Sequence, residues 1–227
     1  MNYRSLITKS AMVCGSSILL LKLAGLVKFS YMVGTYSGFF SGMSIAVPLA
    51  GAFAGVLGSW TVFLARLVMG GAFSAHYLAY CIPGLCASLY WAHANFFVRL
   101  LLPALCIVVF IAHPVGGEAA LYTVYWLIPI ALYFFPRKSL FFQALGSTLV
   151  AHAVGSVIWL YTVPMTATMW LALIPIVAIE RLLFSSGMLI TYRIVEFVRN
   201  KIAVWSSATD VLPMTKKVDQ SYNTAKF

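Results

Sequence analysis

Charged residues are scarce in this chain of 227 amino acids. They make up only 9% of it, against about 25% in a typical globular domain. Residues 29–65, 67–98 and 139–179 contain no Lys, Arg, Asp or Glu at all. Each of these stretches is longer than the roughly 20 apolar residues that cross a hydrocarbon layer of about 30 Å. Because a soluble core does not need such runs, the sequence predicts an integral membrane protein.

Catalytic and nucleotide-binding motifs are also missing. No His-Glu-x-x-His, Gly-x-Ser-x-Gly or Gly-x-x-x-x-Gly-Lys pattern occurs, and the only aspartates, Asp210 and Asp219, lie in the C-terminal tail. The four cysteines show no Cys-x-x-Cys spacing, which argues against zinc. We therefore expect no enzyme, no cofactor, no metal site and no ATP hydrolysis through a phosphate-binding loop.

Apolar residues dominate, at 62% of the chain with a mean hydropathy of +0.95. This composition predicts an all-α fold, a polytopic integral membrane helix bundle with six to eight transmembrane helices. Pro48 is expected to separate two helices, Pro83-Gly84 to interrupt another, and residues 113–117 to form a turn. With six spans, two segments before residue 98 must be re-entrant or only partly inserted. The helices are predicted over about 10–27, 31–46, 49–69, 70–92, 99–112, 119–136, 140–161 and 168–194.

The formal net charge of +10 comes mostly from cations that flank apolar segments. Such cations indicate membrane topology and contact with the lipid bilayer rather than with nucleic acid. They predict a cytoplasmic N-terminus at 1–9, a transmembrane helical domain at 10–197 and a cytoplasmic polar tail, expected to be disordered, at 198–227. The expected location is a bacterial plasma (inner) membrane with both termini cytoplasmic. An aromatic belt is expected near the outer helix ends, formed by Tyr122, Tyr125, Trp126, Trp159, Tyr161 and Trp170.

Small residues recur at four-residue spacing in the first third of the chain. Residues four apart share one helix face, and small side chains let helix backbones approach closely in lipid. We expect this ladder to mark tight helix packing. Ordinary internal packing is favoured over a sliding or partner-docking face. The ladder consists of Gly34, Gly38, Gly42, Ala46, Ala50, Ala54 and Gly58, with Gly51, Gly55 and Ser59 in a second row beside it.

Three ionisable residues inside apolar stretches are the candidate substrate-binding residues: Glu180, His152 and Arg66. An unpaired charge at membrane depth is costly, so such residues pair or face a cavity. Glu180 and His152 are expected near mid-depth on adjacent helices, lining one polar cavity. A structural ion pair is an equal alternative for Glu180, and a bond to a neighbouring helix is the commoner role for a residue like His152.

The chain resembles the substrate-binding S component of energy-coupling factor transporters. The shared features are small size, basic charge, Gly/Ala-rich early segments and no nucleotide motif; Ala11 and Gly15 match the small-x-x-x-small spacing of that family's first helix. The resemblance implies a non-ATPase transport subunit that binds a small solute and works with a transmembrane coupling subunit and separate ATPase subunits. The alternative is a non-catalytic membrane assembly or scaffold protein that packs through its Gly/Ala helix faces.

Overall fold

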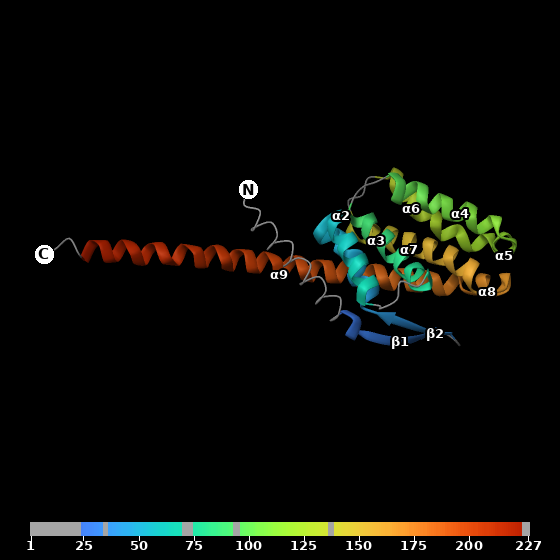
Figure 1. Cartoon of the computed structure of the whole chain (residues 1–227), viewed down its shortest axis with the longest axis horizontal. Coiled ribbons are helices and arrows are strands. Elements are labelled where there is room, and N and C mark those ends of the chain that lie inside the picture. The colour runs from blue at the N-terminus through green and yellow to red at the C-terminus, as the bar shows by residue number, and fades with distance from the viewer. Residues whose placement is uncertain (1–23, 34–35, 70–74, 93–95, 136–138, 224–227) are drawn as a thin grey trace. The chain divides into compact units, whose positions relative to one another are not determined.

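The computed structural model describes residues 24–33, 36–69, 75–92, 96–135 and 139–223, and most of them are helical (Figure 1). The all-α class therefore holds in outline, with one β-hairpin as the exception. The elements are β1 (Lys28–Val33), β2 (Tyr36–Ser41), α2 (Met43–Met69), α3 (Ala75–Ala92), η1 (Phe97–Leu101), α4 (Leu102–Ala112), α5 (Pro114–Glu118), η2 (Ala120–Trp126), α6 (Leu127–Phe134), α7 (Leu140–Thr162), α8 (Ala167–Ala172) and α9 (Ile174–Asn223).

The hairpin takes the place of most of the helix predicted over 31–46, of which only residues 43–46 are helical, at the start of α2. Strands β1 and β2 pair antiparallel, in a register that places Lys28 opposite Ser41 and Val33 opposite Tyr36. The two strands are rich in aromatic residues and contain neither Ala nor Leu, a composition that favours strands. The prediction of a helix here was wrong, because the four-residue spacing of small residues was given more weight than strand propensity.

Helix α2 reverses its direction at Gly55. This glycine has φ 62° and ψ −154°, a backbone conformation that interrupts the helix and that is essentially restricted to glycine. Val47 and Val62, on either side of it, pack in one buried cluster, although a straight helix would separate them by about 22 Å. The helix thus has two arms, 43–54 and 56–69, and the break lies at Gly55 rather than at the predicted Pro48.

Helix α3 lies between α2 and α7 (Figure 1). On the α2 side, the Ser88 hydroxyl donates a 2.9 Å hydrogen bond to Ser59, and a Cβ on Gly51 would overlap the Ser88 carbonyl oxygen. On the α7 side, Ser147 donates a 2.9 Å hydrogen bond to the Ala87 carbonyl. Such short contacts between backbones are how helices associate in lipid. The predicted interruption at Pro83-Gly84 is absent from α3, which continues through both residues.

A second packing centre is aromatic and surrounds Phe110 of α4. The Phe110 ring stacks on Tyr122 at 5.6 Å and meets the rings of Trp126 and Trp170 edge to face, both at 5.2 Å. All four side chains are at most 2% exposed. The predicted aromatic belt was therefore wrong for Tyr122, Trp126 and Trp170, which fill the interior, whereas Trp159 and Tyr161 are exposed.

The other helices follow the prediction in part. The predicted 140–161 coincides with α7, and 99–112 with η1 and α4 together. The predicted 168–194 is divided at Leu173 into α8 and α9. Of the residues 113–117 predicted as a turn, 114–117 form most of the short helix α5 and His113 precedes it. A Cβ on Gly116 would overlap the Phe110 carbonyl oxygen.

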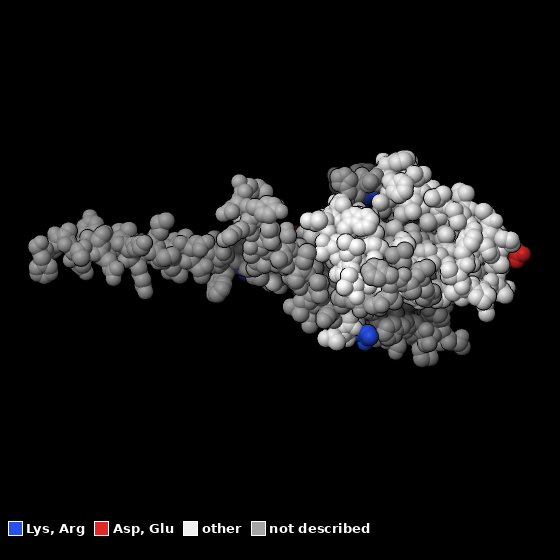
Figure 2. Space-filling view, in the orientation of Figure 1, with Lys and Arg blue, Asp and Glu red and all other residues white. Residues whose placement is uncertain are grey.

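Within the described residues, three helical stretches are long and apolar enough to cross a membrane: Met43–Val68, Leu140–Thr162 and Ile174–Lys201. The first includes the reversal at Gly55, and its two arms are only about 18 and 21 Å long. Large apolar side chains such as Leu57 and Phe134 are exposed, while Ser88, Ser147 and Ser185 are fully buried. The described face in Figure 2 is almost entirely uncharged. Apolar residues outside and polar residues inside are the arrangement that lipid favours.

The chain divides into two units, Met1–Leu189 and Ile190–Phe227. In the second unit, α9 continues to Asn223, so residues 198–223 of the tail predicted to be disordered are helical. No glycine, a poor helix former, follows Gly187, although α9 continues through Pro213. At the other end, residues 1–23 lie outside the described residues, and with them the predicted N-terminus and most of the helix predicted at 10–27.

Candidate functional site

A cavity of about 1020 Å³ lies within the first unit. Its wall is mostly apolar and comes from the end of β2 and from α2, α3, η2, α7, α8 and α9. Buried residues such as Ser156 and exposed ones such as Ser44 and Thr162 both line it. Its polar lining side chains are Ser41, Ser44, Arg66, Tyr80, Tyr122, Thr148, His152, Ser156, Trp159, Thr162, Trp170 and Arg181.

The reversal at Gly55 explains how Arg66 reaches this cavity. In a straight helix Arg66 would lie about 28 Å from Val47. Here both residues line the cavity, and both lie within about 3 Å of the position that a Cβ on Gly84 would occupy. The site is thus formed where the two arms of α2 meet the middle of α3, and the missing side chain of Gly84 provides space for the Arg66 guanidinium.

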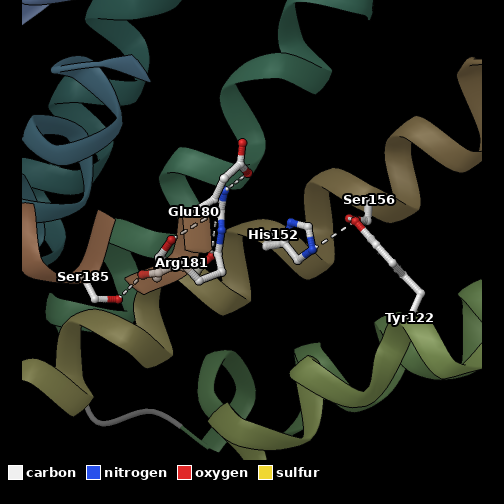
Figure 3. Close-up of polar contacts among 7 residues, drawn as sticks. Tyr122, His152, Ser156, Glu180, Arg181 and Ser185 are labelled. Atoms are coloured by element: carbon white, nitrogen blue, oxygen red, sulfur yellow. Dashed lines mark hydrogen bonds and ion pairs between the residues drawn. The ribbon is translucent and has the colours of Figure 1, made fainter. Parts of the chain in front are cut away.

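Arg181 enters the cavity from α9 and is held by three groups (Figure 3). Its Nη2 donates to the Glu180 carboxylate at 2.9 Å, and its Nη1 donates to the Thr148 hydroxyl of α7 at 3.1 Å. Its guanidinium also lies over the Phe184 ring at 4.8 Å. An ion pair with hydrogen bonds on both sides fixes the orientation of a guanidinium. Ser185 bonds back to the Arg181 carbonyl, which satisfies a second polar group of this turn.

His152 lies one helical turn after Thr148 on α7, so the two residues share a helix face. Its Nε2 is 3.1 Å from the Tyr122 hydroxyl, which is also 3.3 Å from the Ser156 hydroxyl. Figure 3 shows His152 between the Glu180–Arg181 pair on one side and Tyr122 with Ser156 on the other. This arrangement creates a polar strip along the cavity wall, able to donate and accept hydrogen bonds.

The structure places two of the three predicted binding residues, Arg66 and His152, on the cavity wall. Glu180 does not line the cavity; its carboxylate pairs with the neighbouring Arg181. The expectation that Glu180 and His152 line one cavity was therefore wrong for Glu180, and the structural ion pair named as its alternative is present, because the adjacent guanidinium contacts the carboxylate. Among the described residues there is no cluster of His, Cys, Asp and Glu that could hold a metal ion.

Sequence reasoning missed Arg181, Thr148 and Tyr122 as site residues. Arg181 and Thr148 were not singled out as candidates, and Tyr122 was assigned to the membrane interface. One signal was present: an Arg next to a Glu within an apolar segment can neutralise it and still face a cavity. For Tyr122, a contact with α7 some 30 residues later has no local sequence signal.

The predicted small-residue ladder is not a single helix face. Gly34 is outside the described residues, Gly38 lies in β2 and Gly42 in the turn before α2. The rest lies on the two arms of α2, where a Cβ on Gly58 would meet Ala54 and the Ala50 carbonyl across the reversal. The small residues at these positions allow the arms to approach each other.

Comparisons with known proteins find no match for this chain among protein-family models, curated proteins or solved structures.

Proposed function

We propose that this chain is an integral membrane protein that binds a small solute between its helices, as a transport subunit without an ATPase of its own. The observation that carries the proposal is the cavity of about 1020 Å³, which is within the usual size range of small-molecule sites. A mostly apolar wall with a few polar groups, here Arg66, Arg181 and His152, is also typical of such sites.

Membrane location supports this function. Ionisable side chains are rare in membrane segments because burying a charge in lipid is costly, and they usually mark substrate or ion pathways. Here Arg66, His152 and Arg181 come from three different helices, α2, α7 and α9, and line the same cavity. A purely structural bundle gains nothing from placing three such residues around an open volume.

The transport role follows the resemblance to S components. In that case a transmembrane coupling subunit and separate ATPase subunits supply the energy, and both termini face the cytoplasm of a bacterial inner membrane. The scaffold alternative has less support, because the described small residues are used within the chain: Gly51 lies against Ser88, and Gly58 against Ala54.

The proposal is tested by filling the cavity. Ala151 lines the cavity, whereas Ala112 is exposed at the end of α4 and is not among its lining residues. The purified full chain is screened by thermal shift against organic acids, amino acids, nucleosides and sugars. We expect at least one solute class to raise the melting temperature of the wild type and of Ala112→Trp, but not of Ala151→Trp. If no class stabilises the wild type more than Ala151→Trp, the solute-binding function is wrong.

A further inference from the structure

The charge of the cavity wall is not balanced. Arg66 and Arg181 line the cavity, and the described lining residues include no Asp or Glu. Arg181 is neutralised by Glu180 at 2.9 Å. Among the described residues, Arg66 has no carboxylate within 4.0 Å, and its buried Nε has no hydrogen-bond partner. The cavity therefore carries one uncompensated positive charge, and Arg66 provides it.

The Arg66 side chain extends into the bundle rather than toward an end of α2. Its backbone carbonyl accepts a 3.0 Å hydrogen bond from Tyr77, close to the start of α3. Its Nη1, however, would be 3.1 Å from a Cβ on Gly84, which lies seven residues, or about 10 Å, further along α3. An arginine that only reached for lipid headgroups would extend away from the bundle. This one is directed at the cavity.

An isolated guanidinium in an apolar bundle is stabilised by an oxyanion, which it can bind through two parallel hydrogen bonds. We propose that the cavity binds the oxyanion group, a carboxylate or a phosphate, of a molecule with an apolar body, and that Arg66 is its anchor. This inference rests on the proposed function and names the class of its ligand. The single uncompensated charge favours a monoanion, and the apolar wall formed by residues such as Ile158, Leu173 and Met188 favours the apolar body.

Arg181 has a supporting role in this site. Glu180, Thr148 and Phe184 hold its guanidinium in place, while its buried Nε has no partner among the described residues. It can therefore contribute a fixed donor without adding net charge. Removing the Glu180 carboxylate would convert Arg181 into a second uncompensated cation. The proposal thus predicts that the loss of Arg66 weakens oxyanion binding, whereas the loss of the Glu180 carboxylate does not.

The experiment measures binding of three probes that share one aromatic body: benzoate, benzyl alcohol and benzylammonium. Isothermal titration uses the full chain in nanodiscs of neutral phosphatidylcholine. We expect benzoate to bind at least about tenfold more tightly than the other two, because a hydrogen bond to a charged group contributes that much.

Variants of the site test which residue gives this preference. Arg66→Gln should lose it, Arg66→Lys should keep part of it, and Glu180→Gln should bind benzoate at least as tightly as wild type. Arg193→Gln, which removes an exposed Arg from the second unit, is the control and should match wild type.

Equal binding of the three probes, or a benzoate affinity of Arg66→Gln within twofold of wild type, would overturn the oxyanion site. If Arg66→Gln does not fold, Gly84→Ala replaces it, since the added Cβ displaces Nη1 and should also weaken benzoate binding.

Nanodiscs with anionic phosphatidylglycerol identify the source of the oxyanion. If benzoate binds the wild type equally tightly in anionic and in neutral nanodiscs, the natural ligand is a soluble solute. If phosphatidylglycerol competes with benzoate in the wild type but not in Arg66→Gln, the oxyanion belongs to a lipid headgroup. That second result keeps the site but contradicts the transport role. If only the oxyanion inference is wrong, the thermal-shift screen will still find a solute that stabilises the wild type but not Ala151→Trp.

Discussion

Helices α2 and α7 are built from similar residues but differ in shape. Both are apolar, α2 contains three glycines and α7 two, and they have 27 and 23 residues. In α7 the glycines provide close contacts: a Cβ on Gly146 would overlap the Tyr90 hydroxyl, and Gly155 lies near Pro83. In α2, Gly55 has no atom within 4 Å of its Cβ position and instead has the only positive φ among the described residues. Glycine content alone therefore does not indicate whether a membrane helix packs tightly or reverses.

The reversal depends on Gly55, and its loss should have the largest effect. In Gly55→Ala the added Cβ meets no neighbour, so the cost is backbone strain, toward the upper end of about 1–3 kcal/mol. Because a straightened α2 would also remove Arg66 from the cavity, ligand binding should disappear. The free energy of unfolding is measured by detergent titration, together with the cavity binding assay. A Gly55→Ala protein with wild-type stability and binding would show that the reversal does not need glycine.

On the α7 side, Gly146→Ala should destabilise through steric overlap rather than through strain. The new Cβ would overlap the Tyr90 hydroxyl, and Tyr90 is fully buried. Overpacking of this kind costs about 2 kcal/mol. Adding Tyr90→Phe should recover part of the loss in the same unfolding titration, whereas Tyr90→Phe should recover nothing in Gly55→Ala. Rescue of both variants by Tyr90→Phe would contradict the distinction between the two glycines.

A smaller effect is expected at the contact between α2 and α3. Ser59 and Ser88 share a buried hydrogen bond of 2.9 Å, and such bonds contribute about 0.6 kcal/mol on average in a membrane protein. A double-mutant cycle with Ser59→Ala and Ser88→Ala should give a coupling free energy of about this size. Ser147→Ala, which removes a bond between α7 and α3, is the comparison. A coupling free energy of zero would show that this hydrogen bond does not help to hold the second arm of α2 against α3.

The one stabilising effect, of similar size to the serine coupling, is expected for Gly155→Ala. Its Cβ would lie 3.6 Å from Pro83, an ordinary contact, and replacing glycine by alanine inside a helix gains about 0.5–1 kcal/mol. This variant is also the matched control for Gly55→Ala, since both add one methyl group to an apolar helix. A loss of stability in Gly155→Ala would mean that the wall of the cavity tolerates no added volume.

Several local features could be predicted because they depend on composition and spacing. The helix over 140–161 and the one over 99–112 coincide with α7 and with η1 and α4. Arg66 and His152 were chosen as binding residues because charges in apolar stretches are rare, and both line the cavity. Glu180 was chosen on the same rule, but its partner is the adjacent Arg181. The rule finds ionisable residues within apolar stretches and does not tell which of them faces the cavity.

By itself, the sequence of this protein determined that it has apolar helices long enough to cross a membrane, because transfer of uncharged side chains into lipid depends on composition alone. It also determined which few polar residues must be accommodated inside. Only the tertiary structure decided where they meet. The reversal at Gly55 brings Arg66 to the middle of α3, and the contact of Tyr122 with His152 joins residues 30 positions apart. Such contacts depend on how whole helices pack, and a single glycine among the 16 of the chain gives no local sign of its conformation.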